Sequence, residues 1–414
     1  MLQSHLSTLK TIFRPSSPTD DQTLFRGRSA QLKSVMSGLA EVGQHILIYG
    51  ERGVGKTSLG YMAKAIFDAS SPTHAISVRI QCADGESFTE IWQDFYKRLA
   101  AEVAIRDKDF RSHLAAQLDQ ADAILNYPDR DYLTSTDVHR ALSILAASCD
   151  VLIFVDEFDR LGGWDETTPF GDLIKGLSDD RVRVTLVIAG VADSIDGLIK
   201  SHASTPRSLR QILMPRMEQD ELLSIVNDGF HEFSEKSAYS LACTPQAAKT
   251  IARVAEGFPY YAHLLAGAAG SEALFQNSHE ITHLDVFESM IAAIEDADHA
   301  IRSAYVGAVT ARAGANLEAT LTACALTVTD ELGYFSSSDV AQALSNIVGE
   351  TRTTGHVNSQ LSRFSSAPHW VLDRKEISQR KIRYRFHDTL MRPFVLLKGY
   401  QNGILDTKAG KSSS

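Results

Sequence analysis

Residues 45–58 read HILIYGERGVGKTS, and this stretch decides the class of fold. HILIY is a short, mainly apolar run followed by glycine, which predicts a buried strand of a parallel sheet. The eight residues from Gly50 to Thr57 match the pattern GxxxxGK[ST] in full. Glycine permits close backbone approach and positive φ. The N–H groups of the loop and the start of the next helix can therefore surround a phosphate group.

Each residue of this loop has an expected role. Lys56 would reach the β- and γ-phosphates of ATP, and the Thr57 hydroxyl would bind Mg²⁺. The other expected nucleotide contacts are Gly50, Glu51, Arg52, Gly53, Val54, Gly55 and Ser58. The alternative is a glycine-rich turn that contains a lysine by coincidence, and the flanking strand and helix argue against it.

A second motif, VLIFVDE, lies downstream at 151–157. An apolar strand that ends in Asp156 and Glu157 delivers two carboxylates at the carboxyl edge of the sheet, where α/β folds bind ligands. Asp156 would hold Mg²⁺ through its water shell, and Glu157 would polarise the attacking water. Taken alone, the same letters describe a strand followed by an acidic loop. The phosphate loop upstream favours the catalytic interpretation.

Strands and helices alternate across the first half of the chain. Apolar runs at 75–81 and 182–189 join the two runs above. Helical patterns separate them at 57–69, 87–104, 109–125, 136–147 and 169–178. This alternation predicts βαβ units and a parallel sheet within residues 20–230. The charged segment 105–135 is expected to be a solvated insertion.

The remainder of the chain has a different pattern. Residues 218–298 show helical periodicity without strand signals, which predicts a small helical domain. Residues 300–399 contain helical stretches and then strand-like runs, at 316–332, 337–348, 354–365, 369–373 and 382–387. Helices followed by a hairpin is the order of a winged helix, in which 354–365 would be the recognition helix.

GERGVGKTSL at 50–59, together with FVDEFDRL at 154–161, resembles the AAA+/STAND branch of the P-loop ATPases. The archaeal-type ATPases and the origin-recognition initiators are the most similar in pattern. The resemblance implies ATP hydrolysis and an α/β P-loop NTPase (AAA+-like) parallel-sheet core with a helical lid and a C-terminal winged-helix domain. The expected segments are a lead-in at 1–22, the core at 23–217, the lid at 218–299, the winged helix at 300–400 and a tail at 401–414.

The resemblance also implies roles for residues between and before the two motifs. In the entry motif LFRGR at 24–28, the backbone around Phe25 and Arg26 would lie against adenine. Asp193, or else Ser194, would be the polar sensor that follows the last strand-like run of the core. Either side chain could instead cap the next helix.

Two later stretches add further expectations. The basic stretch SHASTPRSLRQILMPRM resembles the place where related ATPases carry an arginine that reaches the γ-phosphate of a neighbour. Arg207 and Arg210 are the candidates, with Arg216 third, and a solvated basic loop is the alternative. EGFPYY lacks the lid arginine of the initiators and is similar to the GxP motif of STAND ATPases, whose proline, Pro259 here, would lie near adenine. The alternative is a helix start with proline in its first turn.

The net charge of −10 over 414 residues is unevenly distributed. Residues 300–414 contain 14 Lys and Arg against 9 Asp and Glu, a net +5, which leaves −15 on the rest. The basic residues near the expected wing are Arg374, Lys375, Arg380, Lys381, Arg383 and Arg385. They would contact DNA phosphates in a salt-dependent way. The alternative is docking on protein, including the acidic part of the same chain.

The expected recognition helix has a polar and an apolar side. The side chains that suit base edges are His356, Asn358, Ser359, Gln360 and Arg363. The side chains expected in the core are Val357, Leu361 and Phe364. This division is consistent with duplex DNA as a partner, and equally with a packing or protein-docking domain.

Several classes of protein are excluded by what the sequence lacks. It has no run of about 18 uncharged apolar residues, so no membrane span is expected, and no secretory signal. Its four cysteines are far apart, which fits reduced thiols in the cytoplasm. HExxH and GxSxG are absent, so zinc hydrolysis and acyl transfer are not indicated.

Three functions remain open at this stage. The leading hypothesis is an ATP-binding and ATP-hydrolysing switch whose nucleotide state controls assembly into a homo-oligomer or partner binding through the winged helix. The second is an ATP-regulated DNA-binding initiator or regulator. The third is a signalling or defence ATPase with a protein partner.

Overall fold

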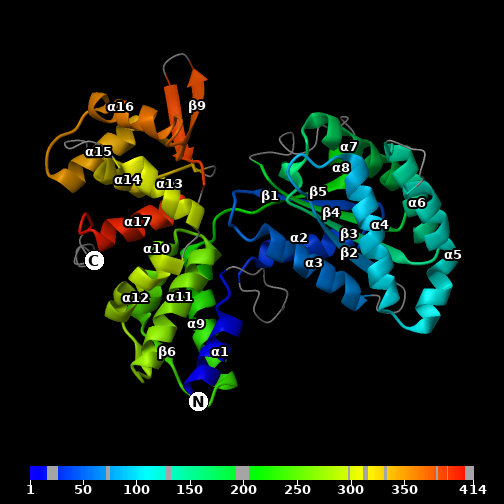
Figure 1. Ribbon diagram of the computed structural model, residues 1–414, viewed down its shortest axis with the longest axis horizontal. Coiled ribbons are helices and arrows are strands. Elements are labelled where there is room, and N and C mark those ends of the chain that lie inside the picture. The colour runs from blue at the N-terminus through cyan, green and yellow to red at the C-terminus, as the bar shows by residue number, and fades with distance from the viewer. Residues whose placement is uncertain are drawn as a thin grey trace. The chain divides into compact units, whose positions relative to one another are not determined.

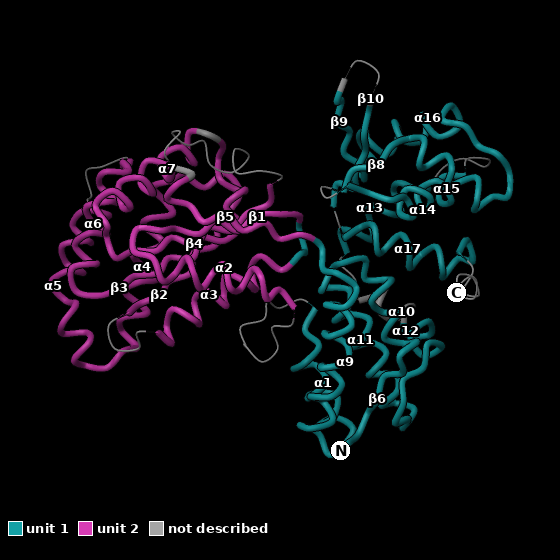
Figure 2. Tube along the Cα trace, turned by 180° about the vertical axis from the view of Figure 1, so that it is seen from behind, with its two compact units in different colours: residues 1–17, 52–54, 216–414 teal, residues 18–51, 55–215 magenta. Residues whose placement is uncertain are grey.

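The computed structural model describes residues 1–15, 27–70, 75–126, 132–192, 205–296, 299–310, 316–330, 333–378, 381–388 and 390–405. The chain divides into two compact units (Figure 2). We call Pro18–Glu51 with Gly55–Pro215 the α/β unit. We call Met1–Ser17, Arg52–Val54 and Arg216–Ser414 the helical unit.

The α/β unit is built on a parallel sheet of five strands in the order β2-β3-β4-β1-β5 (Figure 1). Its strands are β1 (His45–Gly50), β2 (Ala75–Gln81), β3 (Asp150–Asp156), β4 (Val184–Val191) and β5 (Leu209–Leu213). Its helices are α2 (Ser29–Leu39), α3 (Lys56–Ser70), α4 (Phe88–Ala104), α5 (Lys108–Leu125), α6 (Ser135–Ala146), the 3-10 turn η1 (Phe158–Arg160), α7 (Trp164–Asp179) and α8 (Thr205–Ser208). The predicted α/β P-loop core with a parallel sheet is confirmed.

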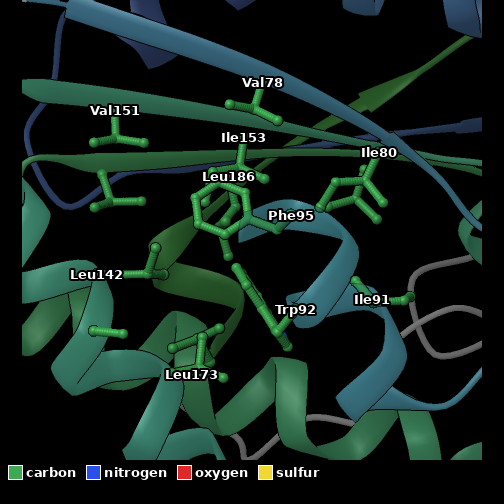
Figure 3. Close-up of a cluster of buried hydrophobic side chains, with 14 of the residues drawn as sticks. Val78, Ile80, Ile91, Trp92, Phe95, Leu142, Val151, Ile153, Leu173 and Leu186 are labelled. Carbon is green, nitrogen blue, oxygen red and sulfur yellow. The ribbon is translucent and has the colours of Figure 1, made fainter. Parts of the chain in front are cut away.

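The alternation of side chains along β3 assigns a layer to each face of the sheet. Val151, Ile153 and Val155 belong to a fully buried apolar cluster that includes Trp92 and Phe95 of α4 (Figure 3). The intervening side chains of β3 point to the opposite face, which α3 covers. Asp156 therefore ends the strand on the α3 side, next to the phosphate loop.

One prediction about this unit is wrong, and one of its strands was not predicted. The segment 105–135 is not a solvated insertion, because α5 buries Phe110 and Leu114 in the same apolar cluster and its charges lie on the outer side. The basic stretch at 201–217, for which no strand was predicted, contains the fifth strand, β5, which pairs with β1 from His45–Leu209 to Tyr49–Leu213. A five-residue edge strand with polar residues in its middle has too weak an apolar pattern to be recognised alone.

The helical unit begins with a helix bundle. Its elements are α1 (Leu2–Ile12), α9 (Gln219–Lys236), α10 (Pro245–Ala255), α11 (Pro259–Phe275), α12 (His283–Asp296) and a two-strand pair, β6 (Ala242–Cys243) with β7 (Glu280–Ile281). Helix α1 packs on this bundle through buried Leu9, Ile12 and Phe13. Glycines at 229, 267 and 270 leave the space that Phe13 and Leu9 occupy.

The rest of this unit has the element order of a winged helix (Figure 1). Its elements are α13 (His299–Val309), α14 (Leu317–Leu326), β8 (Phe335–Ser336), α15 (Ser337–Val348), α16 (Thr354–Phe364), β9 (Leu372–Ser378), β10 (Lys381–Phe386) and α17 (Met391–Gln401). The three strands form an antiparallel sheet in the order β8-β10-β9. The first wing strand begins at Leu372, later than the expected 369, because the residues before it form a turn.

Across the described parts of both units, no helix combines the length and the apolar character that a bilayer crossing requires.

Candidate active site

The phosphate loop connects the end of β1 to the start of α3. Gly50, Gly53 and Gly55 have φ values of 146°, 82° and 97°, a region in which other residues are strained. A Cβ on Gly50 would also collide with the carbonyl oxygen of Met214. Lys56 Nζ donates hydrogen bonds to the carbonyl oxygens of Gly50, at 3.1 Å, and Glu51, at 2.7 Å. The lysine thus closes the loop upon itself.

Four other residues of the loop are also expected to contact the nucleotide. Ser58 lies in the first turn of α3. Arg52, Gly53 and Val54 group with the helical unit. The contribution of these four residues to nucleotide binding stays a prediction.

The two motifs meet at Thr57 and Asp156. Thr57 Oγ1 donates to Asp156 Oδ1 at 3.1 Å, although the residues are 99 positions apart. The Asp156 carboxylate is almost fully buried. Thr57 stands at the start of α3 and Asp156 at the carboxyl end of β3, so the sheet topology brings them together.

Glu157 leaves the strand in the left-handed region, with φ 55° and ψ 39°. Its Oε2 accepts a hydrogen bond from Gln81 Nε2 at 3.0 Å and from Arg160 Nη1 at 2.9 Å. Arg160 also pairs with Asp84, at 3.3 Å. A non-glycine residue at positive φ is a strained feature that is often found at functional sites. The adjacent carboxylate of Asp156 has other partners, Thr57 and Arg79.

Sequence reasoning missed Arg79, Gln81 and Arg160 as members of this site. Arg79 Nη2 lies 2.7 Å from Asp156 Oδ2. A signal for the first two was present, because β2 reads AISVRIQ and places polar residues two apart near the end of an apolar strand. Residues two apart share one face of a strand, and this face is the α3 side, where Asp156 also lies.

Cys82 follows β2 and donates its backbone N–H to the carbonyl oxygen of Asp156 at 2.9 Å. Burial, and then the negative charges of Glu86, Asp156 and their neighbours, raises the pKa of the Cys82 thiol far above its usual value. The thiol is therefore protonated and unsuited to nucleophilic chemistry.

The donors at this site fit Mg²⁺ and ATP. A hydroxyl and a carboxylate oxygen 3.1 Å apart are the hard oxygen ligands that Mg²⁺ takes, directly or through water. Three glycines at positive φ and a lysine at the start of a helix form a cradle of the kind that binds phosphate.

The three candidates for the arginine that reaches the γ-phosphate of a neighbouring molecule have different surroundings. Arg207 is exposed on α8. Arg210 is half-buried on β5, and its Nη2 donates to Gln44 Oε1 at 3.3 Å. Arg216 stacks on the ring of Phe258, at 4.9 Å from the ring centroid. Among the three, Arg207 therefore has the surroundings best suited to reaching another molecule.

The other predicted nucleotide contacts are Phe25, Arg26, Asp193 and Pro259. Phe25, Arg26 and Asp193 lie outside the described residues, as does Ser194. Pro259 is the first residue of α11, as both the nucleotide-contact and the helix-start interpretations require.

The segment with the element order of a winged helix supplies a second candidate surface. Val357, Leu361 and Phe364 of α16 are buried, as predicted, while His356, Asn358 and Ser359 are exposed. Gln360 accepts a hydrogen bond from Thr320, and Arg363 donates to the carbonyl oxygen of Thr310 at 3.0 Å. These two side chains are thus engaged within their own domain.

The basic residues of the wing also divide into two groups. Arg383 pairs with Asp330 at 2.6 Å, and Arg385 pairs with Asp373 at 3.2 Å. Arg374 and Lys375 are exposed on β9. Arg380 and the side chain of Lys381 are outside the described residues.

Comparison with known proteins agrees with the fold and the motifs. Residues 24–188 match the family model of the AAA ATPase domain. This span contains both the phosphate loop and the strand that carries Asp156. The α/β unit thus has a P-loop NTPase fold, and its residues 24–188 are similar to AAA ATPase domains. A search of curated protein sequences finds no match.

Solved structures of similar fold include three archaeal proteins. The ORC2 protein of Aeropyrum pernix, in ADPNP and ADP complexes, is 11% identical with a TM-score of 0.51, covering 95% of this chain and 98% of that chain. The ORC1 protein of the same organism, in complex with DNA, is 16% identical with a TM-score of 0.49, covering 96% and 98%. The Walker-type ATPase PABY2304 of Pyrococcus abyssi is 14% identical with a TM-score of 0.48, covering 93% and 99%. At 11% identity the likeness to the ORC2 protein concerns the fold alone.

Proposed function

We propose that this protein binds ATP with Mg²⁺ and hydrolyses it to ADP and phosphate. The observation that carries the proposal is the hydrogen bond of 3.1 Å between Thr57 and Asp156. It joins the two sequence motifs at the end of the sheet where α/β proteins bind ligands.

Each residue of the site has a defined task in this reaction. The loop N–H groups and Lys56 bind the phosphates, for which Lys56 exchanges its bonds to Gly50 and Glu51 for phosphate oxygens. Thr57 and Asp156 hold Mg²⁺, which when bound neutralises charge on the phosphate oxygens. Glu157 accepts a proton from the attacking water through the carboxylate oxygen that Gln81 and Arg160 leave available.

Isothermal titration calorimetry with ATP tests the binding site. Lys56→Ala should abolish ATP binding, while Lys64→Ala, on the same helix and paired with Asp68 at 3.2 Å, should leave it unchanged. Unchanged affinity in Lys56→Ala would overturn the site. Glu157→Gln should bind ATP and lose turnover, and persistent hydrolysis in that variant would require another base.

We further propose that the nucleotide state acts on the winged helix as in a STAND-type switch. Two contacts inside the helical unit support this. Arg392 of α17 pairs with Glu256 at the end of α10, at 3.3 Å. The Tyr261 hydroxyl donates to the carbonyl oxygen of Leu390 at 2.6 Å. A movement of the helix bundle would therefore carry the winged helix with it.

A second candidate function is ATP-regulated binding of duplex DNA, as in an initiator or regulator. Exposed Asn358 and Ser359 on α16 and exposed Arg374 and Lys375 on β9 favour it. Phosphate contacts make affinity fall with salt. Fluorescence anisotropy of duplex DNA at several salt concentrations is the test.

The double variant Arg374→Ala/Lys375→Ala should weaken DNA binding and lower its salt dependence. Arg383→Ala removes a charge that is paired with Asp330 and is the matched control. If neither variant nor salt changes the anisotropy, a protein partner replaces DNA. A pull-down in ATP and in ADP then identifies the nucleotide state that binds the protein partner. A signalling or defence ATPase should bind its partner in one of these states.

We also propose that the protein assembles with itself and acts in the cytoplasm. Exposed Arg207 would serve a neighbouring copy in a nucleotide-dependent homo-oligomer, where such arginines raise turnover by about 10³–10⁵-fold. The four cysteines are free thiols, which suits the reducing cytoplasm.

A further inference from the structure

Arg79 gives the magnesium-supporting carboxylate a positive partner from its own chain. Arg79 Nη2 lies 2.7 Å from Asp156 Oδ2. The side chain of Asp156 is 3% exposed and that of Arg79 is 23% exposed. A buried carboxylate is costly without a partner, and a guanidinium at this distance supplies both charge and a hydrogen bond.

The guanidinium is held in position from several directions. Its carbon lies 5.3 Å from the ring centroid of Tyr61 and 5.9 Å from that of Phe154. Its Nη2 also lies 3.3 Å from Gln81 Oε1. Aromatic contacts of this kind favour a cation and restrict its motion. The ion pair between Arg79 and Asp156 is therefore fixed by the surrounding side chains on the α3 side of the sheet.

The two oxygens of Asp156 have separate partners. Oδ2 is paired with Arg79, while Oδ1 accepts from Thr57 Oγ1 and from the backbone N–H of Glu157, both at 3.1 Å. A divalent cation would sit on the Oδ1 side, next to Thr57. The arginine and aspartate together carry no net charge, so the attraction of Asp156 for a second cation is largely cancelled.

A bound triphosphate changes this balance, because its oxygens add several negative charges next to Thr57. We propose that Arg79 makes divalent-cation binding at Thr57 and Asp156 conditional on bound nucleotide, so that the cation does not occupy the empty site. The inference rests on the proposed function, since it takes these two residues as the metal site. Arg79 is a positioning residue, because it acts through Asp156.

Mn²⁺ binding to the whole 414-residue chain without nucleotide, measured by electron paramagnetic resonance, tests this role. The wild type should bind no Mn²⁺ at this site. Arg79→Met keeps an unbranched apolar stem but removes the guanidinium and its charge, and it should create a Mn²⁺ site. Arg79→Met/Asp156→Asn should lose that site again, which would locate it at Asp156.

Two controls make the outcome specific. Arg79→Lys retains the charge and should behave as the wild type. Arg98→Met, which breaks an exposed helix pair with Asp94 of 2.6 Å, should also leave Mn²⁺ unbound. If thermal melting shows that Arg79→Met does not fold, Arg79→Gln removes the charge with a polar side chain and is read in the same way.

The results separate this inference from the function on which it rests. The role of Arg79 would be overturned if the wild type and a folded Arg79 variant without the charge gave equal Mn²⁺ titrations. Tight Mn²⁺ binding by the nucleotide-free wild type would overturn it as well. Failure of the wild type to bind ATP with Mg²⁺ would instead overturn the proposed function.

Discussion

Gln81 Nε2 donates a hydrogen bond to Glu157 Oε2 over 3.0 Å, between the ends of two neighbouring parallel strands. Because Arg160 binds the same oxygen, the second oxygen of Glu157 is left for water. Gln81→Ala should let the carboxylate rotate and lower kcat by about tenfold, equivalent to about 1.4 kcal/mol. Steady-state ATP hydrolysis measures kcat, and calorimetry should show unchanged ATP affinity.

A matched control for this prediction is Gln276→Ala, which breaks a similar amide–carboxylate contact of 2.9 Å with Glu272 on α11. It should leave kcat unchanged. Wild-type turnover in Gln81→Ala would mean that Arg160 alone orients Glu157.

Arg207 should act on a neighbouring molecule. Arg207→Ala should lower turnover at protein concentrations where the wild type assembles, since the exposed arginine would be missing from the shared site. A mixture of Arg207→Ala with Lys56→Ala should regain turnover, because one copy provides the ATP site and the other the arginine. The measurement is the ATPase rate against protein concentration.

Arg210→Ala is the companion variant. It should lower the free energy of unfolding by about 1 kcal/mol, through loss of packing and of the contact with Gln44, rather than change turnover. If Arg207→Ala hydrolyses ATP at the wild-type rate at every protein concentration, Arg207 does not act on the ATP of a neighbouring molecule.

Gly60 of α3 lies directly against the ring of Phe154 on β3. A Cβ at this position would overlap the ring of Phe154. Gly60→Ala should lower the free energy of unfolding by about 1–3 kcal/mol, as overpacking of a core does. Gly307→Ala in α13 meets no atom nearer than 4.0 Å and should be neutral or stabilising by up to about 1 kcal/mol. Urea denaturation followed by circular dichroism compares the two, and equal effects would contradict the close contact.

His45 should make stability depend on pH. Burial lowers the pKa of His45 to about 4, and its Nδ1 accepts the N–H of Leu186 at 3.0 Å. Between pH 6.5 and 4 the unfolded chain binds a proton at this position that the folded chain does not, so stability falls as the pH falls. From pH 7 to 5 the loss should be about 2 kcal/mol.

His45→Asn can accept the same N–H without titrating in this range. Urea unfolding of the wild type and of this variant at both pH values isolates the contribution of His45. The same pH slope in both proteins would assign the effect to other groups, such as His263, whose pKa burial also lowers to about 4.

Local pattern was sufficient for most elements of the α/β unit. The strand at 45–49 and the helix before β3 were predicted within one residue at each end, because their apolar spacing and caps are encoded in adjacent positions. The helix after β3 begins five residues before the predicted start at 169. The cap at Ser87, for example, forms a complete capping box with Glu90 before α4. Strand β5 and the burial of α5 were missed, since both depend on contacts with elements distant in the sequence.

The phosphate loop could be predicted from the sequence alone, because GxxxxGK[ST] between a strand and a helix is a continuous local structure. The two carboxylates at the end of an apolar strand could be predicted in the same way. The contacts of Arg79 with one oxygen of Asp156 and of Thr57 with the other became visible in the folded chain. The physical reason is the register of β2 against β3, which sets Gln81 beside Asp156 and turns Arg79 toward the same face.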